Sequence, residues 1–211
     1  MTAFSKCNAV ANKVQWEGMV KHMRFRIATQ ADVPAMLAVY APYVRETAYS
    51  FEYEVPTEEL FAGRLSDIGA RFPWLICEES DGTVIGYAYA AAAFERAAYM
   101  WDADLSVYLA PAAHRRGIGR TFYAILEDIL AQQGYHNIYA LVSGANEVST
   151  AFHRALGYDL MTVMPKTGYK FGEWHDMLWF HKRLCPPDAP KSAPIPFTPA
   201  MLDAALTRVG V

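Results

Sequence analysis

The stretch HRRGIGRTFYAILEDIL, residues 114–130, places the tightest limits on how this chain can fold. Its apolar residues recur at spacings of three and four, the pattern of one buried helix face: Ile118, Phe122, Ile125, Leu126, Ile129 and Leu130. Gly134 stands where such a helix would end in a left-handed cap. The stretch predicts a glycine-containing loop that opens onto an amphipathic helix, and the loop is either a phosphate site or only a flexible start to the helix.

Signals for strands and further helices occur on both sides of this stretch. Asp32 and Pro34 begin one helical pattern, and Thr57 is an N-cap for another that ends before Arg71. Because two strands joined across the tight turn SDGT precede helices that lie between later strands, the predicted fold class is α/β with a mixed sheet. Strands are expected at about residues 23–29, 74–79, 84–94, 103–109, 137–142, 158–164 and 177–181, and a short helix at 146–156.

The length of the chain and its apolar content predict one globular domain with extensions. The 211 residues are 53% hydrophobic, enough to bury a sizeable core. Residues 1–22 lack the apolar core and cleavage site of a secretory signal, so we interpret them as an N-terminal extension. Six of the twelve prolines follow Cys185, a composition that favours extended chain over core. The predicted catalytic domain is 23–185, followed by a Pro-rich C-terminal tail at 186–211.

Charge and cysteine content argue against several classes of protein. A formal net charge of −3 gives no reason to expect nucleic acid as a partner. The three cysteines, Cys7, Cys77 and Cys185, fit neither a disulfide framework nor paired zinc ligands, so we expect no metal and a reducing cytoplasm. The apolar run at 85–94 is too short to cross a membrane.

The loop before the helix has the residues of an anion site. The first turn of a helix presents unpaired N–H groups and the positive end of the dipole, which suits phosphate. Gly117 and Gly119 let the backbone approach an anion, and Arg115, Arg116 and Arg120 add charge. No Lys-Ser or Lys-Thr pair ends the loop, and no acidic residue follows at the spacing of a ribose ligand, so nucleoside triphosphates and dinucleotides are disfavoured.

The residues from His114 to Gly119 resemble the acyl-CoA pyrophosphate loop of the GNAT N-acetyltransferase superfamily, with His114 where that pattern has Gln or Arg. Four segments, AYMWDADLSVYLAPAAHRRGIG, RFPWL, FHRALGY and GYKFGEWHDM, together resemble the phosphinothricin and methionine sulfone/sulfoximine N-acetyltransferase family. The resemblance spans about residues 24–182 and implies a mostly antiparallel central sheet flanked by helices, acetyl-CoA as co-substrate, a small-molecule amine as acceptor and a homodimer.

The resemblance also implies which residues hold the coenzyme. The backbone of the strand before the loop would bind the pantetheine arm and an oxyanion, and the loop would bind the pyrophosphate. Asn146 matches a coenzyme-contacting Asn of the family, although a simple N-cap is an equally good interpretation. The implied coenzyme-binding residues are Val107, Tyr108, Leu109, Arg115, Arg116, Gly117, Ile118, Gly119, Arg120 and Asn146.

Two catalytic residues follow from the same resemblance. The family's general base, a Glu, falls on Asp104, which is one methylene shorter and therefore favours a bridging water. The alternative for Asp104 is a solvated carboxylate at the end of a strand. His153 stands where many members have a Tyr that protonates the leaving thiolate; it is either that acid or a packed or substrate-facing histidine.

The acceptor site is expected around the Arg of RFPWL, because a guanidinium fork suits a carboxylate, phosphinate or sulfone oxygen. Aromatic residues are either pocket wall or core, namely Phe51, Tyr53, Tyr108 and Trp174. Lys170 and His175 lie on a predicted loop that either closes over the substrate or is plain surface. The predicted substrate-binding residues are Phe51, Arg71, Phe72, Pro73, Asp104, Leu105 and Ser106.

The sequence therefore predicts an enzyme that moves acetyl from acetyl-CoA to the α-amino group of a small amino-acid analogue. Two alternatives stay open: an acetyltransferase for another amine, such as a peptide, polyamine or drug, and a non-catalytic CoA-binding module. A wide acidic cleft would favour the first alternative. Binding of CoA without turnover would favour the second.

Overall fold

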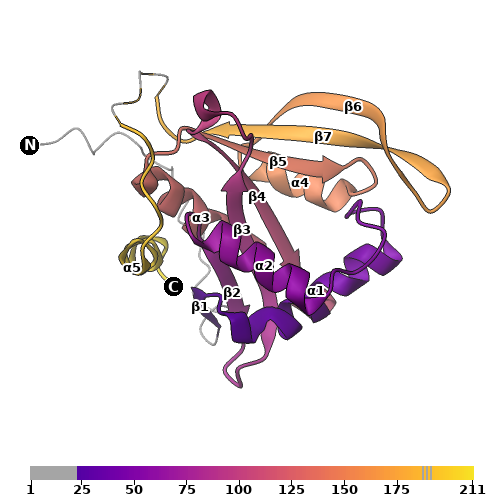
Figure 1. Ribbon diagram of the computed structural model, residues 1–211, viewed down its shortest axis with the longest axis horizontal. Helices are drawn as coiled ribbons and strands as arrows, with labels where there is room; N and C mark the ends of the chain where they lie inside the picture. The colour runs from indigo at the N-terminus through magenta and orange to yellow at the C-terminus, as the bar shows by residue number, and fades with distance from the viewer. Residues whose placement is uncertain (1–22, 187, 189, 191) are drawn as a thin grey trace, which may run out of the picture.

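The computed structural model describes residues 23–186, 188, 190 and 192–211. A seven-stranded sheet forms its centre, in the order β1-β2-β3-β4-β5-β7-β6 (Figure 1). Only β4 and β5 are parallel, and every other neighbouring pair is antiparallel, so the predicted mixed, mostly antiparallel sheet is confirmed. The strands are β1 (Arg24–Ile27), β2 (Trp74–Glu78), β3 (Val84–Ala92), β4 (Asp102–Leu109), β5 (Asn137–Ser143), β6 (Asp159–Lys170) and β7 (Glu173–Arg183).

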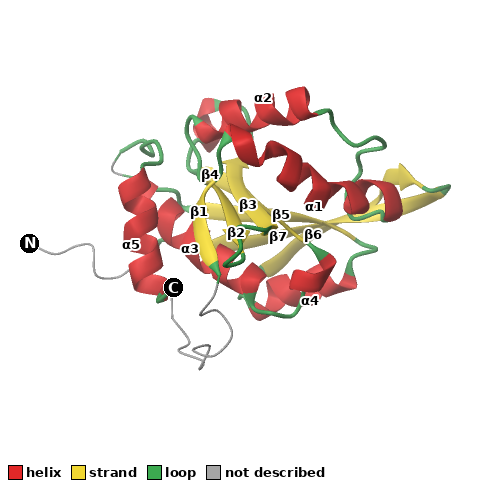
Figure 2. Cartoon of the chain, turned by 90° about the horizontal axis from the view of Figure 1, so that it is seen from below, coloured by secondary structure: helices red, strands yellow, loops and turns green. Residues whose placement is uncertain are grey.

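Helices cover both faces of the sheet. Figure 2 shows α1 and α2 on one face and α3 and α4 on the other, with α5 beside α3. Two hydrophobic cores follow from this layering, one under α3 and one under α1 and α2. The helices are α1 (Val33–Glu46), α2 (Glu58–Gly69), α3 (Ile118–Gln133), α4 (Glu147–Ala155) and α5 (Pro199–Val209), with short 3₁₀ turns at Gln30–Asp32, Ala97–Tyr99 and Pro111–Ala113.

Local sequence signals set the ends of these helices as predicted. Thr57 caps α2, because its side chain accepts a hydrogen bond of 3.2 Å from the Leu60 amide. Pro34 lies in the first turn of α1, where its missing N–H costs nothing. Gly134 ends α3 with φ of 94°, in the left-handed region that favours glycine.

The β6–β7 hairpin is longer than the sequence predicted. Strands expected at 158–164 and 177–181 extend to 12 and 11 residues, and the hairpin reaches past the end of α1 (Figure 1). Lys170 and His175 therefore lie in the paired strands rather than on a loop. The sequence missed this extension because Pro165, Gly168 and Gly172 interrupt the alternating pattern, and the register does shift between Met164 and Gly168.

The C-terminal segment corrects another expectation. An extended tail was predicted, but residues 199–209 form α5, which packs on α3. Leu202 and Ala205 are 5% and 0% exposed and belong to the core under α3. Ahead of the helix, the Ile195 amide donates to the Gln133 carbonyl at 2.9 Å. Proline content misled because Pro199 stands in the first helical turn, where proline is favoured. The predicted N-terminal extension, residues 1–22, lies outside the described residues.

Candidate active site

The sheet opens between β4 and β5. These strands pair only from Asp102 to Asp104, opposite Asn137 to Tyr139. Beyond that point β4 stays with β3 as far as Leu109, while β5 continues along β7. The second half of β4 therefore has a free edge.

The backbone groups that face this opening can be identified from the strand register. The Ala110 amide donates to the Ile85 carbonyl on β3 at 2.9 Å. Because successive residues of a strand direct their N–H and C=O groups to opposite edges, Leu109, Val107 and Leu105 direct theirs away from β3. These are the groups to which an extended ligand could pair as an added strand.

Leu109 already has a partner on this edge. The Tyr43 hydroxyl of α1 donates to the Leu109 carbonyl at 2.7 Å and accepts from its amide at 3.3 Å. The His114 Nε2 lies 3.1 Å from the Tyr43 hydroxyl and 3.3 Å from the Leu109 carbonyl. All three groups are satisfied when His114 carries its proton on Nε2. The free edge is thereby limited to the Leu105 carbonyl and to the amide and carbonyl of Val107, because the strand register directs the Leu105 amide to Tyr139 of β5. Tyr43, 66 residues away in sequence, could not be found from local patterns.

The loop before α3 is a concave row of N–H groups. Among the described residues, the six backbone amides of residues 115–120 have no hydrogen-bond acceptor. Positive φ angles of 60° at Arg115 and 83° at Gly117 shape the loop. The Arg116 side chain turns away and pairs with Glu79 at 2.7 Å, whereas Arg115 and Arg120 are exposed. The loop can therefore bind an anion through its backbone, with two of its three arginines available.

Gly119 and Asn146 connect this loop to α4. A Cβ on Gly119 would lie 3.4 Å from the Phe152 ring, so glycine allows α3 to begin close against α4. The Asn146 side chain accepts a hydrogen bond of 2.9 Å from the Ser149 amide, which makes Asn146 the N-cap of α4. Its Nδ2 group remains available for another contact.

Asp104 lies at the point where β4 leaves β5. By strand alternation its side chain shares the α1–α2 face with Ser106 and Tyr108, and the Tyr108 ring packs edge-on against Tyr40 at 4.7 Å. Burial raises the pKa of Asp104 from 3.8 to about 6, and no side chain in the described part of the chain hydrogen-bonds its carboxylate. A carboxylate of this kind can accept a proton near neutral pH, and it is not a fully solvated strand end.

His153 is packed inside the molecule. It is 3% exposed, and its ring stacks on Phe180 with centroids 5.4 Å apart. Its Nε2 lies 2.8 Å from the Tyr123 hydroxyl and its Nδ1 lies 2.8 Å from the Ser149 carbonyl, and burial lowers its pKa. Both ring nitrogens are therefore engaged within the core, which is the packed arrangement rather than that of a proton donor to the opening between β4 and β5.

Arg71 lies away from Asp104, on the opposite face of the sheet. Its Nε donates to the Tyr135 hydroxyl at 3.1 Å, and its guanidinium lies 5.9 Å from the centre of the Phe72 ring. Phe72 and Tyr135 belong to the core under α3, on the face of the sheet opposite the Asp104 side chain. Pro73 is buried, and its carbonyl accepts from the Ala90 amide. The predicted grouping of Arg71 and Phe72 with Asp104 is therefore not found.

A different charged pair lies on the Asp104 face. Arg64 of α2 bonds Glu52 through Nη2 and Oε1 at 2.7 Å, while the Oε2 atom of Glu52 is buried without a partner among the described residues. Arg64, Glu52 and Asp104 all lie close enough to influence Tyr89, whose hydroxyl interacts with Ser106 and whose pKa is raised by burial. The sequence could not show this pair, because one member lies on a loop and the other on a helix.

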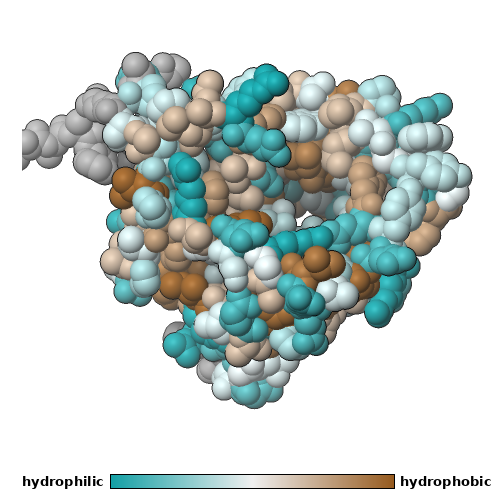
Figure 3. Space-filling model, in the orientation of Figure 1, coloured by the Kyte–Doolittle hydropathy of each residue, from teal (hydrophilic) through white to brown (hydrophobic). Residues whose placement is uncertain are grey.

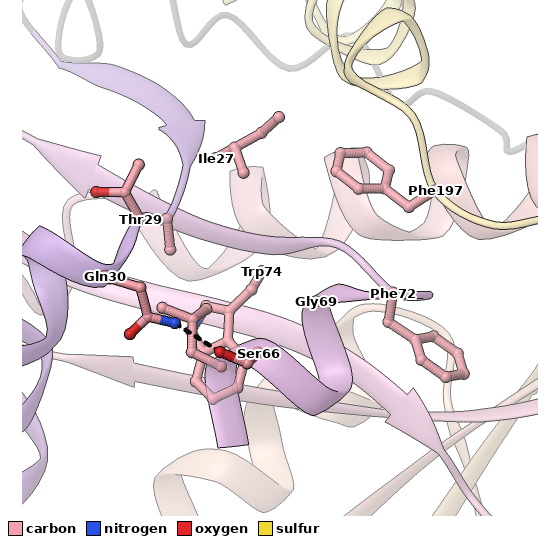
Figure 4. A pocket seen from close by; sticks show the side chains of 10 residues that line it. Ile27, Thr29, Gln30, Ser66, Gly69, Phe72, Trp74 and Phe197 are labelled. Atoms are coloured by element: carbon pink, nitrogen blue, oxygen red, sulfur yellow. Dashed lines mark hydrogen bonds between the residues drawn. The ribbon is translucent and has the colours of Figure 1, made fainter. Parts of the chain in front are cut away.

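The space-filling view shows a hollow between the α1–α2 layer and the part of the sheet beyond the opening (Figure 3). A separate cavity of about 260 Å³ lies between the end of β1, α2 and Phe197, and Figure 4 shows the bond of 2.8 Å from Gln30 to Ser66 within it. That cavity contains neither Asp104 nor the loop 115–120 and is not the candidate active site.

Other kinds of site are not found in the part of the chain that the structure describes. No group of three or more His, Cys, Asp or Glu side chains could hold a metal ion within residues 23–186, 188, 190 and 192–211. In the same residues, no helix combines the length and apolarity needed to cross a membrane.

Comparison with known proteins identifies this arrangement. The family model for the acetyltransferase (GNAT) domain matches residues 25–179, most of the chain. The chain belongs to the GNAT acetyltransferases. In this GNAT domain the matched region includes β4, the loop, α3 and α4, so the opening and the row of amides lie within the family's domain.

Relatives with assigned activities match this GNAT chain over most of its length. The phosphinothricin N-acetyltransferase of Streptomyces viridochromogenes is 31% identical over 169 residues, 80% of this chain and 92% of that protein. The L-methionine sulfoximine/L-methionine sulfone acetyltransferase of Pseudomonas aeruginosa is 30% identical over 171 residues, 80% of this chain and 97% of that protein. The crystal structure of a phosphinothricin acetyltransferase from Sinorhizobium meliloti in complex with acetyl-CoA is 32% identical with a TM-score of 0.78, covering 82% of this chain and 95% of that chain. The chain is an acetyl-CoA-dependent N-acetyltransferase.

Proposed function

We propose that the enzyme acetylates the α-amino group of a small amino acid with a phosphinate, sulfone or sulfoximine side chain. The activities assigned to its relatives support this substrate class. The observation that carries the chemistry is Asp104, a carboxyl group with a pKa of about 6 at the point where β4 and β5 part.

Two backbone features support a binding mode for acetyl-CoA. The pyrophosphate sits on the six free amides of residues 115–120, with Arg115 and Arg120 supplying positive charge. The pantetheine arm enters the opening as an added strand beside Leu105 and Val107. The thioester carbonyl then lies next to the Val107 amide, which can stabilise the oxyanion that forms during attack.

The reaction is a direct transfer within one ternary complex. Asp104 accepts a proton from the acceptor's ammonium group through a bridging water, since the side chain is too short for direct contact. The free amine attacks the thioester carbon, and the C–S bond breaks as the tetrahedral oxyanion collapses. The nitrogen, positively charged after the attack, gives its extra proton to the departing CoA thiolate. CoA therefore leaves as the thiol without a protein acid, and His153 is enclosed in the core.

The acceptor's acidic end is placed beside Arg64 rather than Arg71. Arg64 is the guanidinium on the Asp104 face, and only one of its N–H groups is directed to Glu52. A planar fork can still receive a carboxylate or phosphinate oxygen on its remaining donors.

The enzyme is also proposed to be a homodimer. The edge strand β6 has large apolar side chains that are 37–52% exposed, a surface that a second copy would cover: Leu160, Met161, Val163 and Met164.

The test is CoA release from acetyl-CoA with phosphinothricin, methionine sulfone and methionine sulfoximine. We expect turnover with at least one of the three, and loss of about 10²-fold or more in kcat for Asp104→Asn with the affinity for acetyl-CoA kept. Turnover only with peptides or polyamines would select the other acetyltransferase class. Binding of CoA without turnover on any amine would select the binding module.

A further inference from the structure

Lys170 is a buried cation that the proposed reaction does not use. It is 2% exposed, and its Nζ donates to the carbonyls of Val44 and Ser50, both at 2.7 Å. Burial lowers its pKa, and the charge of Glu52 partly opposes that shift. Burying an ammonium group costs free energy unless it is hydrogen-bonded. The groups that Lys170 bonds therefore show which segments it holds together.

The two carbonyls belong to the connection between α1 and α2. Val44 lies in the last turn of α1, whose free carbonyls and dipole favour a cation. Ser50 lies in the loop of residues 47–57 that follows. Lys170 comes from the far end of β6, so one side chain joins this loop to the β6–β7 hairpin across 120 residues or more of sequence.

Two further contacts join the same segments. The Phe51 ring packs against Gly168, where an added Cβ would come within 2.3 Å of the ring. The Tyr53 hydroxyl donates to the Tyr169 carbonyl. On the hairpin side, His175 Nε2 lies 3.1 Å from the Lys170 carbonyl, which holds the two strands together at this point. We call loop 47–57 and hairpin residues 168–175 the clasp.

The clasp is connected by hydrogen bonds to Glu52 and Arg64, the charged pair on the Asp104 face of the sheet. Ser50, whose carbonyl Lys170 binds, also bonds the Tyr40 hydroxyl through its Oγ at 2.7 Å and accepts from the Glu52 amide at 3.2 Å. Glu52 in turn holds Arg64. A chain of direct contacts therefore runs from Lys170 through Ser50 and Glu52 to the guanidinium that faces the acceptor.

We propose that Lys170 is a positioning residue for acceptor recognition: it fastens loop 47–57 to the hairpin and so fixes the Glu52–Arg64 pair on the face of the sheet that carries Asp104. The inference rests on the proposed function for its kinetic consequence. Its structural part, that Lys170 holds the loop, does not depend on the identity of the acceptor. In the described part of the chain no hydrogen bond joins the clasp to the coenzyme loop 115–120, so we expect the affinity for acetyl-CoA to depend little on Lys170.

The test compares Lys170→Met with Lys166→Met, a matched change at an exposed lysine of the same strand. In Lys170→Met we expect the KM for the acceptor to rise about tenfold or more, as the loss of charge-assisted hydrogen bonds implies. The KM for acetyl-CoA stays within about twofold, and Lys166→Met behaves as the unchanged enzyme. Equal changes in both KM values, or no change in the acceptor KM, would overturn the proposal.

A second variant and a second measurement keep the test decisive. Gly168→Ala displaces Phe51 while Lys170 stays in place, and we expect the same rise in acceptor KM. Hydrogen exchange needs no acceptor: amides of residues 47–57 are expected to lose protection in Lys170→Met, and those of α3 to keep it. If the loop amides exchange faster in Lys170→Met but the enzyme acetylates none of the three analogues, the proposed substrate is wrong and the structural role of Lys170 stands. If their exchange is unchanged in Lys170→Met, the structural role of Lys170 is wrong.

Discussion

Asp104 shows how one residue can be useful and costly for the same reason. Burial at the start of the opening raises its pKa to about 6, so the carboxylate is a better proton acceptor than an ordinary aspartate. The same burial means that the folded protein favours the protonated form of Asp104 more than the unfolded chain does. Above the pKa, the enzyme must hold a charge that the unfolded chain would hold more easily.

We therefore expect Asp104→Asn to be inactive but more stable at neutral pH. A carboxyl group whose pKa is raised on folding lowers stability as pH rises from about 3.8 to about 6, and the loss stays constant above that range. The gain in unfolding free energy for the variant should be roughly 1–3 kcal/mol at pH 7 and near zero below pH 3.8. Urea unfolding of both proteins at several pH values measures it. A variant that is less stable than the parent at pH 7 would contradict this account, as would a pH–rate profile of the parent without an inflection near 6.

The candidate site divides into residues that the sequence could predict and residues that it could not. Gly117, Gly119 and Asp104 could be proposed from the sequence because a loop, a helix start and a strand are contiguous in the chain. The surroundings of His153 and Arg71 could not be predicted, because the direction of a side chain depends on partners such as Tyr123 and Tyr135, which come from other elements.

At the scale of elements, the α1–α2 layer forms the acceptor side of the proposed site, and β4 with the start of α3 forms its coenzyme side. Local signals predicted most of these elements, since caps and apolar periodicity are local properties. They missed the long β6–β7 hairpin, whose interrupted strands are held by pairing with each other and by the clasp.

This division predicts that two arginines differ in their importance for the acceptor. Arg64→Lys keeps the charge but loses the planar fork on the Asp104 face of the sheet, and we expect the acceptor KM to rise about tenfold. Arg71→Lys is the matched control, and its acceptor KM should stay within about twofold, because Arg71 bonds Tyr135 on the opposite face. Steady-state kinetics with saturating acetyl-CoA measure both. The reverse ranking would restore Arg71 as the acceptor's partner.

For the molecule as a whole, α5 turns the C-terminal segment into part of the core. Arg208 and Asp128 form an ion pair at 2.6 Å between α5 and α3, and Gln133 holds the residues ahead of the helix. Composition alone could not show this, because the prolines that suggest extended chain precede a short amphipathic helix rather than replacing it.

We expect a chain truncated after Cys185 to be less stable than the full chain. It would expose the apolar surface that Leu202 and Ala205 cover, so its melting temperature should fall by several degrees or more. Light scattering should still show a dimer, since the exposed side chains of β6 are untouched. An unchanged melting temperature would show that α5 adds no stability, and a monomeric truncated chain would assign the interface to the tail.

The six free amides before α3 have a consequence for how the enzyme works over many cycles. In the proposed binding mode they hold the pyrophosphate, which acetyl transfer leaves unaltered, so CoA and acetyl-CoA would be held by the loop in the same way. We therefore expect CoA to inhibit the enzyme competitively with acetyl-CoA, and release of CoA to limit turnover.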